Sequence, residues 1–181
     1  MRIVAGRNRS RRIVVPPGRA VRPTSDRARE AVFASLGRHV AEARVLDLFA
    51  GSGAMGLEAL SRGAASCRFV ERDAAALASI RANVAALDET ERATIERASA
   101  ITALRRLAAA GERFDLVIAD PPYDAVAGLA PALAELVPAV LADAGRVVLE
   151  TAADDALPLP GLVETYNRRI AAARIIIMGP A

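Results

Sequence analysis

The sequence predicts an α/β protein with a mostly parallel sheet that ends in an antiparallel hairpin, preceded by a short basic hairpin and a helix. From about residue 43, short apolar runs alternate with helical patterns. Repeated strand–helix units of this kind build a parallel sheet with helices on both faces. Near the C-terminus two strand-like runs follow one another with no helix between them. Such runs pair as an antiparallel hairpin.

Composition is that of one ordinary globular domain without disulfides. The chain has 181 residues, of which 53% are hydrophobic, which suffices for a core. No run approaches the ~20 apolar residues of a membrane span, and the first residues lack the apolar core of a signal peptide. The single cysteine, Cys67, and the single histidine, His39, form no ligand-spaced cluster, so no metal site is expected. Together these features favour the cytoplasm.

Charge is concentrated at the N-terminus. Nine arginines and one acid, Asp26, fall in the first 29 residues and give that segment a net charge of +8. The whole chain carries +3, so the remainder carries −5. A basic arm on an acidic body predicts a polyanionic partner; a solvated charged surface is the alternative. We therefore divide the chain into a basic extension, residues 1–40, and an α/β domain, residues 41–181.

The basic extension is expected to contain a hairpin and a helix. Apolar residues 3–5 and 13–15 flank an arginine-rich loop, a hairpin pattern. Thr24 or Ser25 can cap a helix that has Asp26 in its first turn. The arginines expected to contact phosphates are Arg7, Arg9, Arg11, Arg12, Arg22, Arg27 and Arg29.

The α/β part divides into five parallel strands, four helices and the terminal hairpin. The expected strands are residues 44–48, 66–71, 93–96, 114–119 and 145–150. The expected helices are residues 54–61, 74–86, 100–110 and 128–141. The hairpin combines residues 162–170 with residues 174–178.

Asp120-Pro121-Pro122-Tyr123 follows the fourth strand, at the edge where α/β sheets bind ligands. Asp120 can accept hydrogen bonds from an amine. Pro121 and Pro122 restrict the backbone and donate no N–H, so their carbonyls can face a ligand. Tyr123 offers a ring to stack on a base. The tetrapeptide predicts a catalytic site for the exocyclic amine of a nucleobase; a proline-rich turn with a solvated aspartate is the alternative.

A glycine-rich turn after the first strand predicts a nucleoside site. Gly51 and Gly53 allow positive φ and close approach to a ligand. Glu71, 20 residues past Gly51, ends the next strand, where an acid accepts both ribose hydroxyls. Together with Gly56 these glycines also fit the dinucleotide pattern, so they do not choose the cofactor alone.

Asp47 favours S-adenosylmethionine over NAD, because a carboxylate there can pair with a cationic amino group but would repel a pyrophosphate. The short chain also leaves no room for a separate substrate domain. Asp73 is expected to cap the following helix. The expected cofactor-binding residues are Asp47, Phe49, Ala50, Gly51, Ser52, Gly53, Glu71, Arg72, Ser99, Ala100 and Asp120.

The motifs together resemble the RsmD family, the bacterial 16S ribosomal RNA guanine-N2 methyltransferases. The resemblance lies in residues 1–7, in R-P-T-S-D-R-A-R-E at 22–30, in L-D-L-F-A-G-S-G-A-M-G-L-E-A-L-S-R-G at 46–63, and in Glu71 and residues 120–123. It spans essentially the whole chain. It implies a Rossmann-like class I S-adenosylmethionine-dependent methyltransferase that modifies one guanine of 16S rRNA, on a 30S subunit or an assembly intermediate. A monomer is expected.

Three positions depart from the family pattern. Asn8 stands where the family often has an aromatic residue, Ser99 replaces an Asp or Asn, and the last hairpin lacks the usual Gly and aromatics. The other readings are a DNA or other RNA amine methyltransferase acting on adenine N6, an NAD-dependent oxidoreductase, and a non-catalytic rRNA-binding assembly factor.

Overall fold

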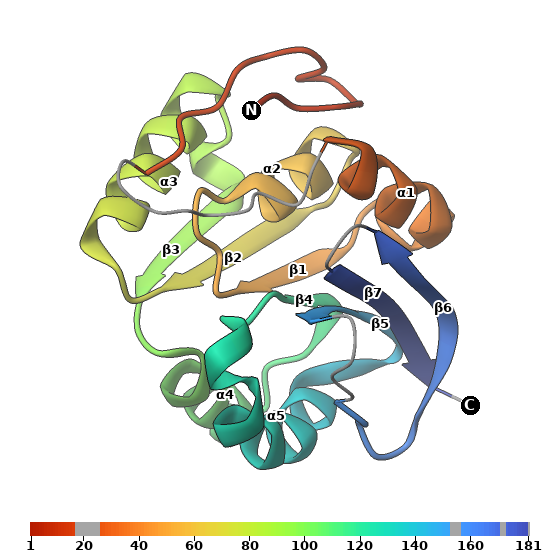
Figure 1. The fold of residues 1–181 in the computed structure, drawn as a ribbon. Helices are drawn as coiled ribbons and strands as arrows, with labels where there is room; N and C mark the ends of the chain where they lie inside the picture. Colours follow the sequence, from red (N-terminus) through yellow and green to blue (C-terminus); the bar gives the residue numbers. More distant parts are fainter. Residues whose placement is uncertain (17–25, 153–156, 171–172, 181) are drawn as a thin grey trace.

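The computed structural model describes residues 1–16, 26–152, 157–170 and 173–180 and shows a seven-stranded sheet between two layers of helices (Figure 1). The strands are β1 Arg44–Leu48, β2 Ser66–Glu71, β3 Ala93–Arg97, β4 Phe114–Ala119, β5 Leu141–Ala152, β6 Leu162–Ile170 and β7 Ala173–Pro180. The helices are α1 Asp26–Leu36, α2 Ala54–Ser61, α3 Ala74–Ala86, α4 Ala100–Ala109 and α5 Val126–Val140. Short 3₁₀ turns are η1 Gly37–His39, η2 Thr90–Arg92 and η3 Tyr123–Ala125.

The sheet has the order β3-β2-β1-β4-β5-β7-β6. Strands β1 to β5 are parallel, whereas β7 runs antiparallel to both β5 and β6. The predicted parallel sheet with a terminal antiparallel hairpin is therefore confirmed. Because the order reverses at β1, with β2 on one side and β4 on the other, the carboxyl ends of these three strands form the switch point where α/β sheets bind ligands.

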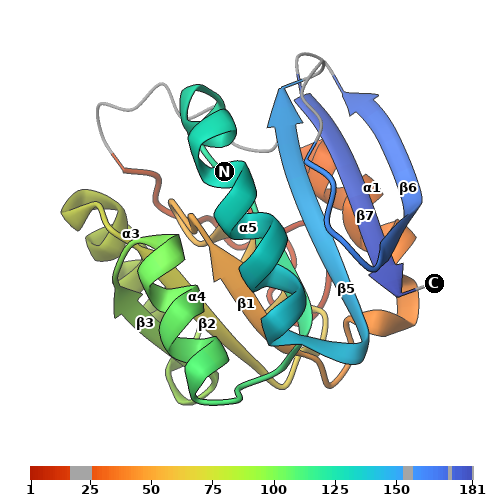
Figure 2. The same cartoon turned by 90° about the horizontal axis from the view of Figure 1, so that it is seen from below.

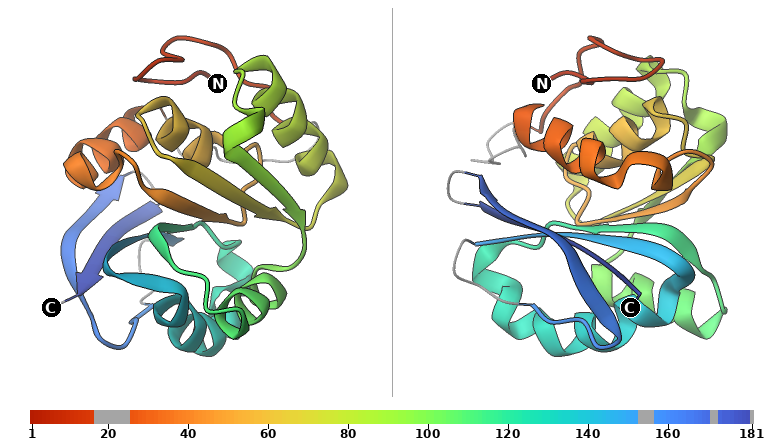
Figure 3. Two further views of the ribbon diagram at one scale, coloured as in Figure 1. Left: turned by 180° about the vertical axis from the view of Figure 1, so that it is seen from behind. Right: turned by 90° about the vertical axis from the view of Figure 1, so that its right-hand side faces the viewer.

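Two hydrophobic clusters fill the two faces of the sheet. One joins α1, α2 and α3 to the sheet and includes Val32, Leu57 and Ile80. The other joins α4 and α5 and includes Leu104 and Val137. Figure 2 shows α4 and α5 in front of the sheet, and the right-hand view of Figure 3 shows both layers edge-on. Strands β1, β2, β4 and β7 are mostly buried between these layers, as their apolar sequences require. The edge strands β3 and β6 are more polar and have no fully buried residue.

The boundaries of the elements largely follow the sequence pattern, and β5 differs most. It begins at Leu141 instead of residue 145. Leu141 pairs with Phe114, and the register then shifts so that Leu116 pairs with Arg146. The four added residues, 141–144, include Asp143 and are followed by Gly145. Asp and Gly are depleted in strands, so the sequence pattern does not reveal this irregular start.

The N-terminal hairpin forms, but with far less pairing than predicted. One antiparallel bridge joins Arg2 and Arg12, supported by a bond from Ile3 N–H to the Arg11 carbonyl (3.0 Å). The ladder ends there because the next backbone donors turn to α2. Val4 N–H and Ala5 N–H donate to the Glu58 carboxylate at 2.8 and 3.0 Å, and Asn8 N–H donates to Ser61 Oγ at 3.0 Å.

Residues 1–16 and α1 share the core of the α/β part. Ile3, Ile13 and Phe33 are at most 5% exposed and belong to the same hydrophobic cluster as Leu57 and Leu60 of α2. The division of the chain at residue 40 therefore concerns its proposed function. None of the described helices is long and apolar enough to cross a membrane.

Candidate active site

The glycine-rich turn between β1 and α2 is a tight loop with three residues in the left-handed region. Phe49, Gly51 and Gly53 have φ values of 60°, 57° and 78°. The Gly53 N–H donates to the Ala50 carbonyl at 2.7 Å, and the Ala50 N–H donates to the carbonyl of Val70 in β2 at 3.1 Å. The glycines adopt this geometry without strain. A positive φ is unfavourable for an aromatic residue such as Phe49. Backbone strain of this kind is found more often at ligand-binding sites than elsewhere.

Asp47 lies beneath this loop and holds the start of α2. Its side chain accepts a hydrogen bond from the Gly56 N–H at 2.9 Å, and the residue is 3% exposed. Burial raises the pKa of this carboxyl to about 7; the Gly56 bond opposes that rise and the charge of Glu71 adds to it. A Cβ on Gly56 would lie 2.5 Å from Cys67 Sγ, so only glycine permits this approach. A contact between Asp47 and a ligand amine remains a prediction.

Glu71 is fixed at the end of β2 against the glycine loop. Its carboxylate accepts hydrogen bonds from the N–H groups of Gly51 (2.9 Å), Arg72 (2.7 Å) and Asp73 (2.9 Å). The loop and the acid that was predicted to bind ribose are thus one assembly, although the ribose contact itself is untested. The side chain of Asp73 accepts from Ala76 N–H at 2.9 Å and caps α3, which confirms that prediction.

Ser99 and Ala100 begin α4 at the same edge of the sheet. Ser99 caps the helix, its Oγ accepting from Thr102 N–H at 3.1 Å. It is exposed, whereas Ala100 is buried. The Ala98 N–H donates to the carbonyl of Glu71 at 3.1 Å, so this turn lies beside the acid. Adenine contact by Ser99 and Ala100 stays a prediction.

The Asp120–Tyr123 segment leaves the end of β4 as a constrained turn. Pro121 is buried and Pro122 is exposed. The Pro122 carbonyl accepts from Ala125 N–H at 2.9 Å and starts η3, whose first residue is Tyr123. The Pro121 carbonyl is consequently the better candidate of the two to accept a hydrogen bond from a substrate.

Asp120 lies beside a recess that opens between the sheet and helices α1 and α2. Burial raises the pKa of Asp120 well above its ordinary value, and the charges of Glu150 and Asp47 raise it further. The Asp120 recess is small and is lined by Val32, Met55, Ile118, Ala119, Asp120, Val148, Glu150 and Ile175. Neither Glu150 nor Met55 was singled out from the sequence as a site residue. An acid at the end of the strand next to β4 was the available signal for Glu150.

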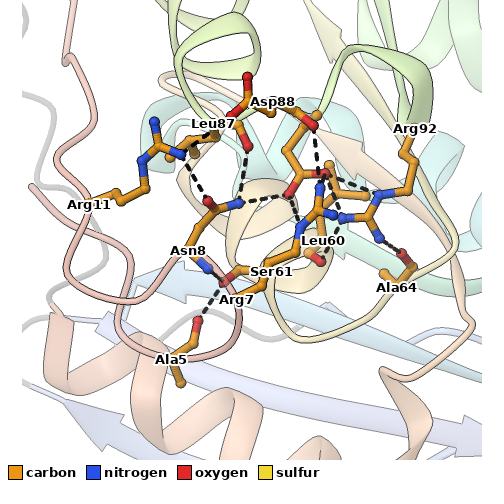
Figure 4. Close-up of polar contacts among 11 residues, drawn as sticks. Ala5, Arg7, Asn8, Arg11, Leu60, Ser61, Ala64, Leu87, Asp88 and Arg92 are labelled. Carbon is orange, nitrogen blue, oxygen red and sulfur yellow. Dashed lines mark hydrogen bonds and ion pairs between the residues drawn. The ribbon is translucent and has the colours of Figure 1, made fainter.

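The arginines predicted to bind RNA fall into different environments. Arg9, Arg12 and Arg27 are exposed, and Arg22 lies outside the described residues. Arg7 forms a 2.5 Å ion pair with Glu89, and Arg11 donates to the carbonyl of Ala86 and to Asn8. Figure 4 shows both guanidinium groups turned toward the protein. These two arginines fasten the hairpin to the body, although about half of each side chain stays exposed.

Arg29 requires a correction, because its side chain is 0% exposed. It donates to Asp26 at 2.9 Å and to the carbonyl of Arg2, and its Nε lies 3.9 Å from Glu58, which is also 0% exposed. A buried guanidinium is out of reach of a phosphate. Arg29 instead ties α1 to α2 and to the N-terminal hairpin.

The fold and the site define a class I S-adenosylmethionine-dependent methyltransferase. The observations that fit the cofactor are the left-handed glycine loop, the anchored Glu71 beside it, and Asp120 at the end of the neighbouring strand. The family described as "Conserved hypothetical protein 95" matches residues 1–178. The chain belongs to that family, which is the RsmD family that its motifs resembled. Among the described residues no group of three or more His, Cys, Asp or Glu could hold a metal.

Known proteins resemble the chain in sequence and in structure. "Ribosomal RNA small subunit methyltransferase D" of Escherichia coli is 41% identical over 123 residues, which cover 68% of this chain and 60% of that protein. YlbH of Bacillus subtilis is 39% identical over 123 residues, covering 68% and 67%. The aligned part is thus under two thirds of the Escherichia coli relative. The solved structure of Escherichia coli yhhF matches with a TM-score of 0.84 and 30% identity, covering 99% of this chain and 97% of that one.

Proposed function

We propose that this chain transfers a methyl group from S-adenosylmethionine to the exocyclic N2 amine of a guanine in 16S rRNA. The observation that carries the proposal is the position of Asp120 and Pro121 at the end of β4, next to the glycine loop and Glu71. A methyl donor held by the loop and an amine held by Asp120 would meet at this edge of the sheet. The Escherichia coli relative is named a ribosomal RNA small subunit methyltransferase, which supports the choice of ribosomal RNA.

Asp120 and the Pro121 carbonyl would position the amine. When bound, S-adenosylmethionine supplies a methyl group on a sulfonium, which leaves as a neutral thioether. The guanine amine is a poor nucleophile because its lone pair is delocalised into the ring. Two acceptors on its two N–H bonds favour a pyramidal nitrogen and direct the lone pair toward the methyl group. Such orientation can lower a barrier by ~7–11 kcal/mol in favourable cases.

Asp120 would also take the proton that the amine loses as the new N–C bond forms. Burial and the neighbouring carboxylates raise the pKa of Asp120, and a carboxylate of raised pKa is the stronger base. Tyr123 would stack on the target base, as its sequence position suggests; its side chain lies outside the part of the structure that is described. That base must be unstacked from its neighbours or already single-stranded.

Residues 1–40 would hold the RNA backbone. Their exposed arginines Arg9, Arg12 and Arg27, with Arg22 beside them in sequence, are the phosphate contacts that we propose. Arg7 and Arg11 would contribute through the exposed halves of their side chains. A monomer would act on 16S rRNA in a 30S particle or an assembly intermediate, in the cytoplasm.

The test is transfer of labelled methyl from S-adenosylmethionine to deproteinised 16S rRNA, to 30S particles lacking the modification and to duplex DNA. Digestion to nucleosides identifies the product. We expect N2-methylguanosine from the ribosomal acceptors alone, and loss of transfer in Asp120→Ala with cofactor binding retained. Label in DNA, or as methyladenine, would contradict the proposed substrate. No transfer to any acceptor by a protein that binds the cofactor would contradict the proposed activity.

A further inference from the structure

The Asp120 recess presents two carboxylates from adjacent parallel strands. Ile118 of β4 pairs with Val148 of β5, and Ala119 pairs with Leu149. Asp120 directly follows the end of β4, and Glu150 is the next residue of β5. Since side chains alternate along a strand, both project on the same face as Ile118 and Val148. Both line the recess.

The walls of the recess are apolar, so the polar edge of a ligand would have these two carboxylates as its partners. Val32 comes from α1, Met55 from α2 and Ile175 from β7. Such walls exclude water, and a polar atom placed there without a hydrogen bond costs a few kcal/mol. Glu150 also lies near enough for its charge to raise the pKa of Asp120. Two neighbouring acceptors select a ligand edge with two neighbouring donors.

Guanine is the RNA base with such an edge around a methylatable amine. Its N2 amine adjoins N1–H, so two adjacent positions donate. In adenine the amine adjoins N1, and in cytosine it adjoins N3; both ring nitrogens are acceptors. Either base would direct a lone pair at a carboxylate, which is repulsive. Asp120-Pro121-Pro122-Tyr123 alone does not make this distinction, because any of these amines satisfies Asp120.

We propose that Glu150 is a specificity-determining residue that accepts a hydrogen bond from guanine N1–H while Asp120 holds the N2 amine. This inference rests on the proposed function and names the group that makes the site selective for guanine. Sites that hydrogen-bond a substrate group reject analogues lacking it. A bare ring nitrogen opposite Glu150 would direct its lone pair at the carboxylate, whereas guanine N1–H would donate to it. Glu150 takes no part in the transfer itself, so its loss affects base choice more than the methyl-transfer chemistry.

A base analogue tests the contact with Glu150 directly. 2-Aminopurine keeps the N2 amine but has an unprotonated N1. The guanine methylated by the wild-type protein is located by mass spectrometry and replaced by 2-aminopurine in 16S rRNA, through ligation of a synthetic fragment. Both RNAs are assembled into 30S particles. For each, kcat and KM are measured with wild type, Glu150→Gln and the matched control Asp143→Asn, an exposed carboxylate of the same strand. Binding of S-adenosylmethionine verifies folding.

We expect the wild type and Asp143→Asn to prefer guanine over 2-aminopurine by at least about 100-fold in kcat/KM. Glu150→Gln should narrow that preference by about tenfold or more, since its amide N–H can donate to the bare N1. An unchanged preference in Glu150→Gln overturns the assignment, with the proposed activity left standing. Equal use of guanine and 2-aminopurine by the wild type also overturns the assignment, and this comparison requires no variant. Absence of guanine methylation by the wild type in every ribosomal acceptor refutes the proposed function instead.

Discussion

Asn8 Nδ2 donates a 2.8 Å hydrogen bond to Glu89 Oε1, joining buried side chains that are 81 residues apart in the sequence. Glu89 also pairs with Arg7 and with Arg92, the latter at 2.6 Å. Asn8 adds bonds to the Leu87 carbonyl and from its own backbone N–H to Ser61 Oγ. Figure 4 shows this polar cluster between the N-terminal hairpin and the turn after α3. Asn8, one of the positions that depart from the family pattern, thus helps Arg7 and Arg11 to fasten the basic hairpin to the body.

Asn8→Ala should destabilise the protein by about 1–3 kcal/mol, because the buried Leu87 carbonyl loses a donor and Glu89 keeps only its arginines. The free energy of unfolding in urea measures this change. Arg9→Ala is the matched control, since Arg9 is the exposed neighbour in the same loop, and it should change stability by less than about 0.5 kcal/mol. Equal losses in the two variants would contradict the anchoring role of Asn8.

Arg29→Ala should lose about 3–5 kcal/mol of stability, because removal of one partner leaves buried Glu58 less compensated. Glu58 would keep Arg62 and the Val4 N–H. Arg27→Ala, an exposed arginine of the same helix, supplies the comparison and should leave the urea midpoint nearly unchanged. If Arg29→Ala unfolded at the wild-type urea midpoint, the buried ion pair would make no measurable contribution to the free energy of unfolding.

Arg9→Ala with Arg12→Ala should weaken RNA binding and reduce its salt dependence. Each lost phosphate contact lowers the slope of log K against log salt by about 0.7–0.9, so the double variant should lose about 1.4–1.8. Binding of 16S rRNA is measured by filter retention at several salt concentrations. The unfolding curve should match that of the wild type. A wild-type slope in the double variant would exclude these two arginines as phosphate contacts.

The sequence predicted the sheet and the placement of the motifs because these depend on local patterns. Apolar strands alternate with capped helices, and Gly51, Glu71 and Asp120 each follow a strand, so the parallel topology alone brings them to one edge. Glu58 and Glu89 could not be predicted in the same way. In sequence both resemble solvated charges of a helix or turn. They are buried only because residues 1–16 pack over α2 and α3, which is a long-range consequence of folding.

Arginine roles were harder still to predict, because charge concentration does not reveal which guanidinium groups face inward. Arg29 is followed by Glu30 in an amphipathic helix, and the pattern alone suits either solvent or a buried acid. The partner that determines the burial of Arg29 is Glu58, which belongs to a different helix. Glu150 was overlooked for a related reason, since its importance depends on the register of β5 against β4.

Asp47 should make the folded protein less stable as the pH rises toward neutrality. Burial raises the pKa of its carboxyl from 3.8 to about 7 in the folded state. Between these values the folded state binds the proton that the unfolded state has released, so the free energy of unfolding falls with rising pH. The contribution is fully present below about pH 3.8 and is lost as the pH passes about 7. At about 1.4 kcal/mol per pKa unit, the loss is on the order of 4 kcal/mol at most.

Asp47→Asn separates this effect from the other titrating groups, because the amide stays neutral and its oxygen can still accept from Gly56. The difference in unfolding free energy between Asp47→Asn and wild type, measured in urea without cofactor, should be near zero at low pH and grow in favour of the variant up to about pH 7–8. Asp143→Asn should follow the wild-type curve throughout, since its carboxylate is exposed. A difference that does not change with pH would mean that the pKa of Asp47 is the same in the folded and unfolded states. Binding of a cationic amino group beside Asp47 should diminish the effect, because an opposite charge favours the carboxylate.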